Sequence, residues 1–583
     1  MLTTNVITVN LERLHFRQIK YGIFLTILSS GIIFPVEATE KEWYEMTTVY
    51  QILPQSFKDT NGDGIGDLQG IREKLDYLHD IGIETLWIQP FYKSPMLDGG
   101  YDIIDFREID PKFGSMEDFK KLVKEVHDKG MKLICDFVPN HTSDESEWFK
   151  KSVRKEDPYT DYYIWKDAKG FDSKSQPIPP NNWLSHSRGS AWRWHEQRRQ
   201  FYFTQFARFQ PDLNFRNPKV QTAIEDILRF WMDLGVDGFR IDAVPQLMED
   251  EQLRDNPWKS PDLVGSDDLR AQIQLYSGHQ NDTFNLVREW RSFVDNYSSR
   301  DNKTNQPPQK TTNIPMYFGL AWLPEYLNST RFDELTHKYI DILPQNGVPN
   351  WQISNHDGGR LASKENPMTA EVMMMAALLL PGFACIYYGD ELQMKNAKLR
   401  PDQTPNSKDI RIPARTPMQW DDSKNAGFSA KDKPWLPVNP DYGRINVKLE
   451  LQDPYSHLNF VKRLVKLRKT PDFQYGQLET CIISEWTYMF VRHLDGHQPF
   501  LVLLNLGSES ENVCISNCLK GQFPSSVVVH TGTPRTRSLF LMSTNLIVLF
   551  FAQKRLYFLR QLLNRNPIRE RRSHLAYPCH LSS

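Results

Sequence analysis

The chain has 583 residues, more than one ordinary domain contains, so we expect two or three domains. Lys and Arg number 70 against 72 Asp and Glu, and the net charge of -2 gives no reason to expect nucleic acid or an anionic membrane as a partner. The hydrophobic share of 40% is enough for a large core, whereas six cysteines are too few for a disulfide scaffold.

The first 40 residues show the pattern expected of a targeting signal. Arg17 and Lys20 precede an apolar run over residues 21–36, and Ala38 follows at a position typical of a cleavage site. This pattern predicts a signal peptide; a type II membrane anchor is the alternative, although 16 residues are short for a span of about 20. Four glycosylation sequons agree with a secretory route and a secreted, extracellular or membrane-associated protein: Asn281, Asn296, Asn302 and Asn328.

A first strand, expected over residues 49–54, runs into an acidic loop. Between residues 59 and 67, side chains with oxygen atoms stand at every second position among glycines, a pattern that can enclose a hard cation such as Ca²⁺. The loop begins like an EF-hand but lacks the closing Glu about six residues after its glycine. Two interpretations stay open: a calcium loop of another kind, or an acidic turn without an ion.

Helices and buried strands then alternate. Apolar residues recur at helical spacing from Leu68 to Leu78, and a strand over 84–90 follows. Ser115 caps a second helix, Gly130 ends it, and a strand over 132–138 comes next. This alternation predicts an α/β fold, a (β/α)8 TIM barrel, in which active sites lie at the carboxyl ends of the strands.

The alternation stops between residues 140 and 208, where Trp, Tyr, Pro and Asn are frequent. An excursion of this length inside a regular series predicts an inserted, loop-rich subdomain after the third strand. Asn217 and Pro218 then open a helix, and Gly235 ends it just before another apolar run.

That run, residues 235–244, carries charged side chains at alternate positions. Arg240 and Asp242 therefore share one face of a strand, and the arginine would keep the aspartate ionised and oriented. Asp242 is thus a candidate nucleophile, and a salt-bridged pair at a strand end is the alternative. Asp136 and Asp357 end other predicted strands, so three carboxylates should meet at the mouth of the barrel.

The later part of the chain completes the barrel and adds a second fold. Three more strands are expected over 316–321, 350–356 and 384–391. Residues 413–420 form a structured loop with one arginine, Arg415. A helix over 458–467 and short strands such as 500–505 then predict a small all-β domain.

These patterns give the expected domains: a signal peptide or anchor (1–40), the catalytic barrel (41–139 and 209–440), the inserted subdomain (140–208), the C-terminal β domain (441–535) and a divergent tail (536–583). Cys135 and Cys385 lie inside apolar runs and are expected to be buried thiols, while Cys514 and Cys518 are the pair that could form a disulfide.

Four stretches resemble the motifs of a known family. Asp136–His141, Gly238–Asp242 and Asn355–Asp357 are similar to three of the four principal motifs of the retaining α-amylase superfamily, and Gln210–Asn214 resembles the marker of its α-glucosidase and oligo-1,6-glucosidase branch. Between about residues 41 and 505, the chain most resembles the secreted maltases of insects. The resemblance implies a calcium-supported barrel that hydrolyses terminal α-linked glucose from small α-glucosides with retention.

The resemblance also implies a role for each matching residue. Asp242 would be the nucleophile, Asp357 would grip the ring hydroxyls and stabilise the transition state, and Tyr101 would stack on the terminal glucose. The residues implied to hold the sugar are Asp102, His141, Arg240, His356 and Arg415. The implied calcium ligands are Asp59, Asn61, Asp63, Asp67 and the carbonyl of Ile65.

The chain departs from the family where the general acid should be. Retaining hydrolysis needs a second carboxyl group, which the family supplies as a Glu that ends the fifth strand. Residues 300–310 are polar with two prolines and show no strand character, so the fifth strand and its acid are expected to be missing. Five Glu residues fall in the interval and none follows an apolar strand: Glu249, Glu251, Glu289, Glu325 and Glu334. Either sequence has been lost here, or the chain is a non-hydrolysing relative.

A second function stays open because the heavy chains of amino-acid transporters share this fold and keep an N-terminal membrane anchor. The chain would then be a non-catalytic ectodomain. The apolar run over 539–552, which a basic stretch follows, could be a membrane tail, an amphipathic helix or an aberrant end, and we favour the last.

Overall fold

The computed structural model describes the chain from residue 41 onward. The described residues are 41–301, 314–322, 327–344, 347–364, 367–404, 409–497, 499–509, 511–514, 518, 528–530, 539–543 and 546–551. The signal or anchor predicted over 1–40 lies outside them, as do residues 302–310 of the polar stretch. Over the described ranges, no helix is both long enough and apolar enough to cross a membrane.

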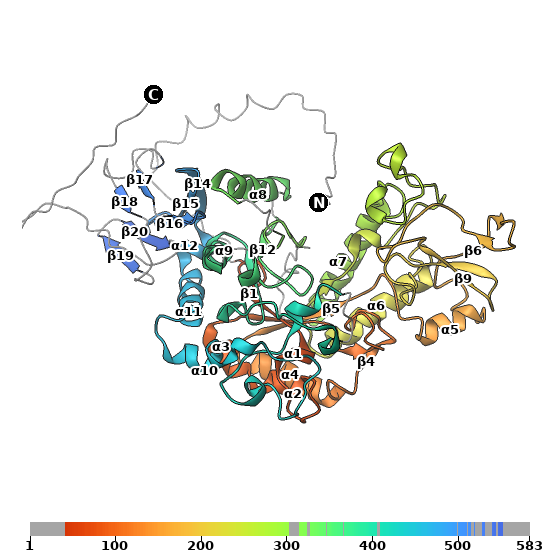
Figure 1. Ribbon diagram of the computed structural model, residues 1–583, viewed down its shortest axis with the longest axis horizontal. Coiled ribbons are helices and arrows are strands. Elements are labelled where there is room, and N and C mark those ends of the chain that lie inside the picture. The colour runs from red at the N-terminus through yellow and green to blue at the C-terminus, as the bar shows by residue number, and fades with distance from the viewer. Residues whose placement is uncertain are drawn as a thin grey trace, which may run out of the picture. The chain divides into compact units, whose positions relative to one another are not determined.

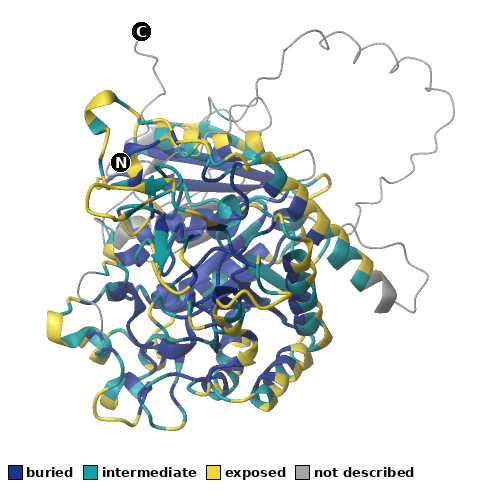
Figure 2. Ribbon diagram, turned by 90° about the vertical axis from the view of Figure 1, so that its right-hand side faces the viewer, coloured by how far each residue is buried: buried dark blue, intermediate teal, exposed yellow. Residues whose placement is uncertain are grey.

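Six parallel strands form the central sheet in the order β11-β5-β2-β1-β13-β12. Figure 1 labels β1, β5 and β12 of this sheet. Their bounds are β1 Thr48–Ile52, β2 Thr85–Ile88, β5 Lys132–Phe137, β11 Gly238–Ile241, β12 Asn350–Gln352 and β13 Phe383–Tyr387. The last strand pairs with the first, as in a barrel, and the sheet lies in the buried interior (Figure 2). This parallel, curled sheet confirms the predicted TIM-barrel fold class.

Helices connect the successive strands. They are α1 Pro54–Phe57, α2 Leu68–Glu73, α3 Leu75–Ile81, α4 Met116–Asp128, α6 Pro218–Asp233 and α9 Pro367–Leu379. Ser115 and Asp118 form a capping box at the start of α4, and Asn217 caps α6 ahead of Pro218, as predicted. Trp231 lies fully buried on α6, beside Val220, Ile224, Ile227 and Leu228, so this helix covers the sheet with an apolar face.

Among the described strands, β11 and β12 are the two ends of the central sheet and do not pair with each other. Two helices, α7 (Asn281–Asp301) and α8 (Ser329–Ile342), fall between them in the chain, and none of the described residues there forms a strand. The strand predicted over 316–321 is therefore wrong. The side-chain oxygen of Asn350 accepts the N–H of Tyr317 at 3.1 Å, and its amide nitrogen bonds to the carbonyl of Pro315, so a side chain replaces the backbone ladder that a strand requires.

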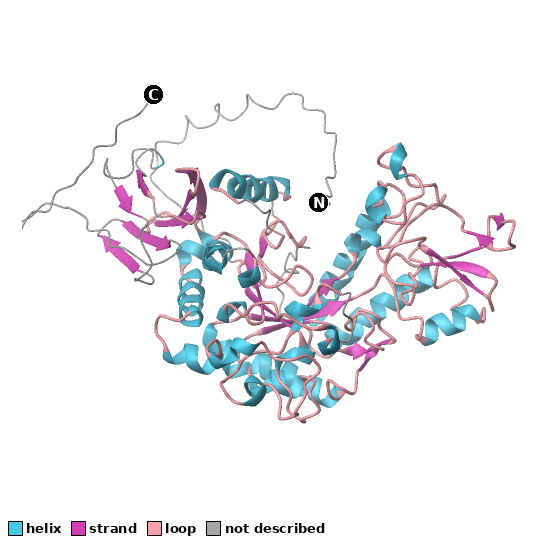
Figure 3. Ribbon diagram, in the orientation of Figure 1, coloured by secondary structure: helices cyan, strands magenta, loops and turns pink. Residues whose placement is uncertain are grey.

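The segment after β5 forms small sheets of its own, which Figure 3 shows apart from the central strands. Its elements are α5 Glu147–Val153, β6 Trp165–Lys166, β7 Gly170–Phe171, β8 Pro177–Ile178, β9 Trp192–His195 and β10 Gln200–Phe203. Trp183, Trp192 and Phe203 form a separate buried cluster here. A hairpin that we did not predict, β3 (Tyr92–Lys93) with β4 (Asp105–Ile109), spans the loop after β2.

The C-terminal part consists of helices and a five-stranded sheet of order β14-β15-β16-β20-β19. Its elements are α10 Val447–Gln452, α11 His457–Arg468, α12 Pro471–Tyr475, β14 Gln477–Ile482, β15 Thr487–His493, β16 Phe500–Asn505, β17 Asn512–Cys514, β18 Val528–His530, β19 Leu539–Ser543 and β20 Leu546–Phe551. Most of the apolar run that we assigned to an aberrant end thus forms two strands. Cys518 pairs with Cys481 across 37 positions, so the pairing predicted with Cys514 is wrong, while Cys135 and Cys385 are buried free thiols as expected.

Candidate active site

The parallel strands bring the three predicted aspartates to the same edge of the sheet. Arg240 lies opposite Asp136 in the ladder between β11 and β5, and the N–H of Asp242 donates to the carbonyl of Phe137 at 2.8 Å. Asp357 follows β12, at the other end of the sheet. The two sides are linked by ring and ion contacts.

One guanidinium group joins two carboxylates on the β5–β11 side. Arg240 Nη1 lies 3.0 Å from Asp136 Oδ1 and 2.7 Å from Asp242 Oδ1, which confirms that Arg240 and Asp242 share a face. The Asp136 side chain is fully buried, whereas that of Asp242 is 22% exposed. Trp87 packs its ring 5.3 Å from the guanidinium carbon. Asp242 is therefore the carboxylate of this pair that a ligand can reach.

Burial dominates the titration of Asp136. Removal from water raises the pKa of Asp136 to about 6, the charge of Arg240 opposes this rise, and the nearby Asp242 adds to it. Tyr101 donates its hydroxyl to Asp136 Oδ2 at 2.8 Å, and burial raises the pKa of Tyr101 well above its usual range. Tyr101 therefore keeps its hydroxyl proton and donates a hydrogen bond to Asp136, whose ionised form is destabilised by burial.

Tyr101 connects this cluster to β12. Its ring stacks on His356 with centroids 5.4 Å apart and planes 3° apart. The amide nitrogen of Gln51 lies 3.0 Å from His356 Nδ1, which places the imidazole proton on Nε2, 3.3 Å from Asp357 Oδ2. Burial lowers the pKa of His356 to about 3, so the ring is neutral and can donate one hydrogen bond.

Asp357 is held by guanidinium groups but stays open to solvent. Arg415 Nη2 lies 3.1 Å from Asp357 Oδ1, and Arg415 Nε donates to the carbonyl of His356 at 3.1 Å. The side chain of Asp357 is 42% exposed. Burial alone would raise the pKa of Asp357, but His356, Arg415 and Arg411 outweigh it and lower the pKa below its usual value.

Arg411 is a contact that the sequence analysis missed. Its guanidinium lies 2.7 Å from Asp98 Oδ1, 2.8 Å from Asp409 Oδ2 and 3.7 Å from Asp357 Oδ1. Arg411 therefore joins the loop after β2 to the carboxylate after β12. A second arginine four positions before Arg415 was the available signal, but only the fold brings it to Asp357.

The other two predicted sugar contacts, His141 and Asp102, are hydrogen-bonded to neighbouring parts of the chain. His141 Nε2 lies 3.0 Å from the carbonyl of Tyr101, and burial lowers the pKa of His141, so its ring is neutral. The Asp102 carboxylate accepts hydrogen bonds from the hydroxyl of Ser94 and the N–H of Leu97, at 3.0 and 2.8 Å. The described hydrogen bonds of the Asp102 carboxylate stay within its loop, and its contact with a sugar stays a prediction.

The acidic loop over residues 59–67 is held by hydrogen bonds from its own backbone N–H groups to its side chains. Asp59 accepts the N–H groups of Gly62 and Gly64 at 2.7 and 2.8 Å, and both glycines have positive φ, of 78° and 89°, which these tight turns require. Across the described ranges, no group of three or more His, Cys, Asp or Glu side chains is placed to hold a metal ion. The oxygen donors are of the type that Ca²⁺ prefers. A calcium site stays a prediction for Asp59, Asn61, Asp63, Ile65 and Asp67.

None of the described Glu residues between the two motifs ends a strand. Glu289 and Glu334 lie exposed on α7 and α8, and Glu251 is exposed in a turn. Glu249 is buried and accepts a hydrogen bond from the amide of Gln205 at 3.1 Å, and burial raises its pKa well above the usual value. Glu325 lies outside the described residues. The absence of the acid stays a prediction, since residues 302–313 and 323–326 of this interval lie outside the described residues.

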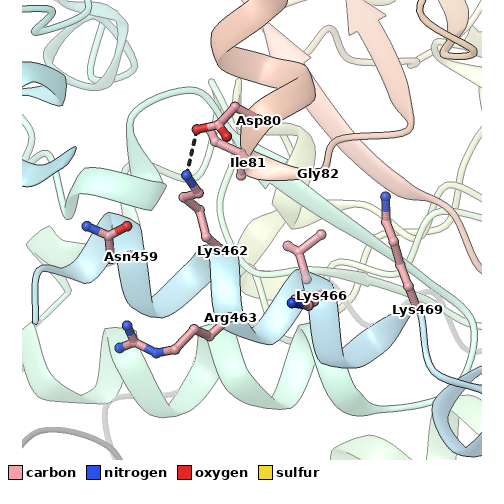
Figure 4. Close-up of a pocket in the computed structure, with 9 residues that line it drawn as sticks. Asp80, Ile81, Gly82, Asn459, Lys462, Arg463, Lys466 and Lys469 are labelled. Carbon is pink, nitrogen blue, oxygen red and sulfur yellow. Dashed lines mark hydrogen bonds and ion pairs between the residues drawn. The ribbon is translucent and has the colours of Figure 1, made fainter. Parts of the chain in front are cut away.

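A cavity elsewhere has a different character. It has a volume of about 420 Å³ and lies between α3 and α11, where Lys462 Nζ pairs with Asp80 Oδ2 at 2.5 Å (Figure 4). Lys466 and Lys469 line it, and none of the predicted site residues does. This basic cavity is separate from the carboxylate cluster.

The chain resembles known proteins over most of its length. It is 39% identical to Maltase 1 of Drosophila virilis over 516 residues (82% of this chain, 80% of the relative) and to a salivary alpha-glucosidase of Aedes aegypti over 520 (84% and 89%). It is also 39% identical to the amino acid transporter heavy chain SLC3A1 of Homo sapiens over 540 residues (88% and 77%). The solved structure of the alpha-glucosyl transfer enzyme XgtA has a TM-score of 0.73 at 32% identity, covering 87% of this chain and 96% of that one.

The resemblance inferred from the motifs is thereby confirmed. Residues 51–476 match the family described as the alpha amylase catalytic domain, a range that contains the whole carboxylate cluster. Glycosidase-type relatives and structural neighbours agree with this match. The chain belongs to the α-amylase family and is a glycoside hydrolase of the α-glucosidase type.

Proposed function

We propose that the chain binds the terminal α-linked glucose of small glucosides at the carboxylate cluster and cleaves it by a retaining mechanism. The observation that carries the proposal is the pair of solvent-accessible carboxylates, Asp242 and Asp357, each held by its own guanidinium group. Neutral imidazoles and a tyrosine ring surround them, and such a mixture suits an uncharged ring with many hydroxyl groups.

In this mechanism Asp242 Oδ attacks the anomeric carbon as the bond to the leaving oxygen breaks, and a glucosyl ester forms. Arg240 keeps the attacking oxygen oriented. Asp357, ionised because of Arg415 and His356, accepts hydrogen bonds from ring hydroxyls and stabilises the positive charge that develops on the sugar. Water then releases glucose with the original configuration.

The leaving oxygen needs a proton, and the described residues offer no acid at the strand end where the family has one. General acid catalysis contributes typically about 10²–10⁴-fold. We therefore propose that hydrolysis of maltose, sucrose and other sugars with poor leaving groups is impaired by about this factor. Activated aryl glucosides need little protonation and are less affected.

The test measures the turnover of maltose and of 4-nitrophenyl α-glucoside by two proteins. One is the purified chain, and the other is a variant in which a strand ending in Glu is inserted between residues 301 and 314. We expect the insertion to raise maltose turnover by about 10²-fold or more and aryl turnover far less. An equal gain on both substrates would contradict the account of the missing acid.

A second candidate is a non-catalytic ectodomain, which the similarity to an amino acid transporter heavy chain favours. An ectodomain has no need of exposed carboxylates held by arginines, so the cluster supports the enzyme instead. Binding of glucose, measured by calorimetry, separates the two functions. An enzyme should bind glucose and lose that binding in Asp357→Asn, whereas a non-catalytic ectodomain should not bind glucose.

The name of the salivary mosquito relative supports secretion of this chain as well. We further propose that the loop over 59–67 binds Ca²⁺. Removal of the ion with EDTA should lower Tm by several degrees, because a ligand at about 100 times its Kd contributes about 2.7 kcal/mol. Added Ca²⁺ should restore Tm in the parent chain but not in Asp63→Ala. An unchanged Tm in EDTA would contradict a calcium role.

A further inference from the structure

The basic cavity between α3 and α11 is lined mainly by positive charge. Its one acidic side chain, Asp80, belongs to α3. Figure 4 shows the lysines on α11, with Asp80 and Gly82 across from them at the end of α3. The basic side chains come from α11 and from its C-cap residue: Lys462, Arg463, Lys466 and Lys469. The lining therefore carries three more positive than negative charges.

The three lysines lie on one face of the helix. Lys462 and Lys466 are four positions apart, and Lys469 follows three positions later, so neighbouring ammonium groups repel each other. Cations in the last turn complement the negative end of a helix dipole, which accounts for Lys466 and Lys469. Lys462 lies six positions before the end of α11, outside that turn. The helix dipole therefore explains only part of this row of lysines.

Acidic side chains of the chain pair with the two ends of the row. Lys462 pairs with Asp80, and Lys469 Nζ lies 3.4 Å from Glu84 Oε1. The side chains of Asp80 and Glu84 are 60% and 36% exposed, and ion pairs this open to water stabilise a fold little. Among the described residues, Lys466 in the middle has no acidic partner. A stronger anion can therefore replace the outer partners and pair with the central lysine as well.

The cavity stays open because of Gly82. This residue has a φ of 96°, and a Cβ atom on it would fall 2.9 Å from Val465 Cγ1 and 3.7 Å from Lys469 Nζ. Ile81 and Val465 are buried and form an apolar wall. The space of about 420 Å³ has the size of a small-ligand site.

We propose that the basic cavity binds a small polyanion that carries at least two phosphate or sulfate groups. From Lys462 to Lys469 the helix extends about 10 Å, at a rise of about 1.5 Å per residue, so one oxyanion is too small to contact all three lysines. A ligand with two or more such groups can contact them all, because each ammonium binds a phosphate or sulfate oxygen as a point charge. The body of the ligand would rest on Ile81 and Val465.

The cavity lies at the opposite end of the barrel from the carboxylate cluster. Gly82 and Glu84 come just before β2, whereas Asp242 and Asp357 follow the carboxyl ends of their strands. The polyanion would therefore bind without competing with a sugar. The inference is independent of the proposed function.

The experiment measures Kd by titration calorimetry on the full chain at low ionic strength, where charge pairing is least screened. The probes are inorganic phosphate, inorganic pyrophosphate and a sulfated disaccharide derived from heparin. Pyrophosphate should bind at least about 10-fold more tightly than phosphate, because its two groups reach two lysines at once. Excess binding of this kind should disappear if only single charges are involved.

Three variants locate the site. Lys466→Ala should weaken pyrophosphate binding about 5–10-fold, and Lys466→Arg should stay within about 3-fold of the parent because it keeps the charge. Lys338→Ala, which removes an exposed lysine from the middle of α8, is the matched control and should change nothing. Lys466 is exposed, so its replacement leaves the fold intact.

The outcomes separate the possible sources of the ligand and decide the proposal. Tighter binding of the sulfated disaccharide than of pyrophosphate would identify a sulfated polysaccharide, and the reverse order would identify a phosphorylated compound; either supports the site. No binding of any probe, equal affinities for phosphate and pyrophosphate, or an equal loss in Lys466→Ala and Lys338→Ala would overturn it.

Discussion

The two sides of the carboxylate cluster are built by different means. On the first side, β11, β5 and β2 form continuous parallel ladders, and Asp136, Arg240 and Asp242 extend from backbone that neighbouring strands hold. On the second side, β12 has no described strand next to it toward β11, and the side chains of Asn350 and Lys364 hold the adjoining segment instead. We name these the ladder side and the side-chain side.

The difference extends to charge. On the ladder side, the effect of burial outweighs that of the Arg240 charge and raises the pKa of Asp136 to about 6. On the side-chain side, the groups paired with Asp357 outweigh the effect of burial and lower its pKa. The side chain of Asp357 stays 42% exposed. A barrel strand can therefore present a carboxylate in either of two ways, by burying it beside one arginine or by leaving it open between several cations.

The largest expected effect is on the ladder side. Asp242→Asn should lower the turnover of 4-nitrophenyl α-glucoside by about 10⁴-fold or more, because an amide cannot form the glucosyl ester. Asp237→Asn is the control: it makes the same chemical change at the start of β11, where Asp237 pairs with Lys132 and His127. Activity that survives Asp242→Asn would break the assignment of the nucleophile.

Arg240→Met should destabilise the fold by about 3–5 kcal/mol in urea unfolding at pH 7, because two carboxylates then lose their shared cation. The native Asp136 binds its proton at higher pH than the unfolded chain does, so its contribution to stability falls as pH rises through its native pKa. The loss should therefore be smaller at pH 5 than at pH 7.

The exposed ion pair of Arg154 and Glu156, whose side chains are 43% and 46% exposed, provides the control. Arg154→Met should cost far less stability than Arg240→Met at either pH. A loss in Arg240→Met that is as small as this, or that does not depend on pH, would show that the ladder side does not rely on its arginine.

On the side-chain side, Arg415→Met should raise the pKa of Asp357. A depressed carboxyl pKa keeps the ionised form down to low pH, so maltose binding in the parent chain should persist at pH 5. In the variant, affinity should be lost as pH falls, with a midpoint about one pH unit higher or more. Arg411→Met should shift it less, since Arg411 lies 3.7 Å away. Identical midpoints in all three chains would contradict the charge pairing.

The smallest effect concerns Lys364, whose pKa burial lowers to about 8. An unfolded lysine keeps its proton to about pH 10.4, so the native chain binds fewer protons between these values and this group makes stability rise with pH. The difference in Tm between the parent chain and Lys364→Met should grow by about 2–4 °C from pH 7.5 to 9.5. A constant difference would mean that Lys364 is not buried beside Ala321.

The ladder side could be predicted from the sequence, whereas for the side-chain side the sequence predicted β12, His356, Asp357 and Arg415 but not the contacts that hold them. β1, β2, β5 and β11 are short apolar runs between glycine and capping signals, and period-2 geometry places Arg240 and Asp242 on one face. Each of these inferences uses neighbours in the chain. The predicted positions of the aspartates at the sheet edge follow from strand polarity alone.

The side-chain side depends on contacts between distant residues. Residues 316–321 have the composition of a strand, but the N–H of Tyr317 bonds to the side chain of Asn350, and nothing in the local pattern reveals that. Arg411 reaches Asp357, and Cys518 reaches Cys481, for the same reason.

One measurement tests the central claim, that Asp242 attacks glucose at a site without a general acid and base. The chain is incubated with α-glucosyl fluoride, from which fluoride departs without needing a proton. The peptides of the chain are then examined by mass spectrometry. We predict that a glucosyl ester accumulates on Asp242, because no base activates water, and that azide discharges it as glucosyl azide. An ester on another residue, no ester at all, or discharge at the same rate without azide would contradict the account.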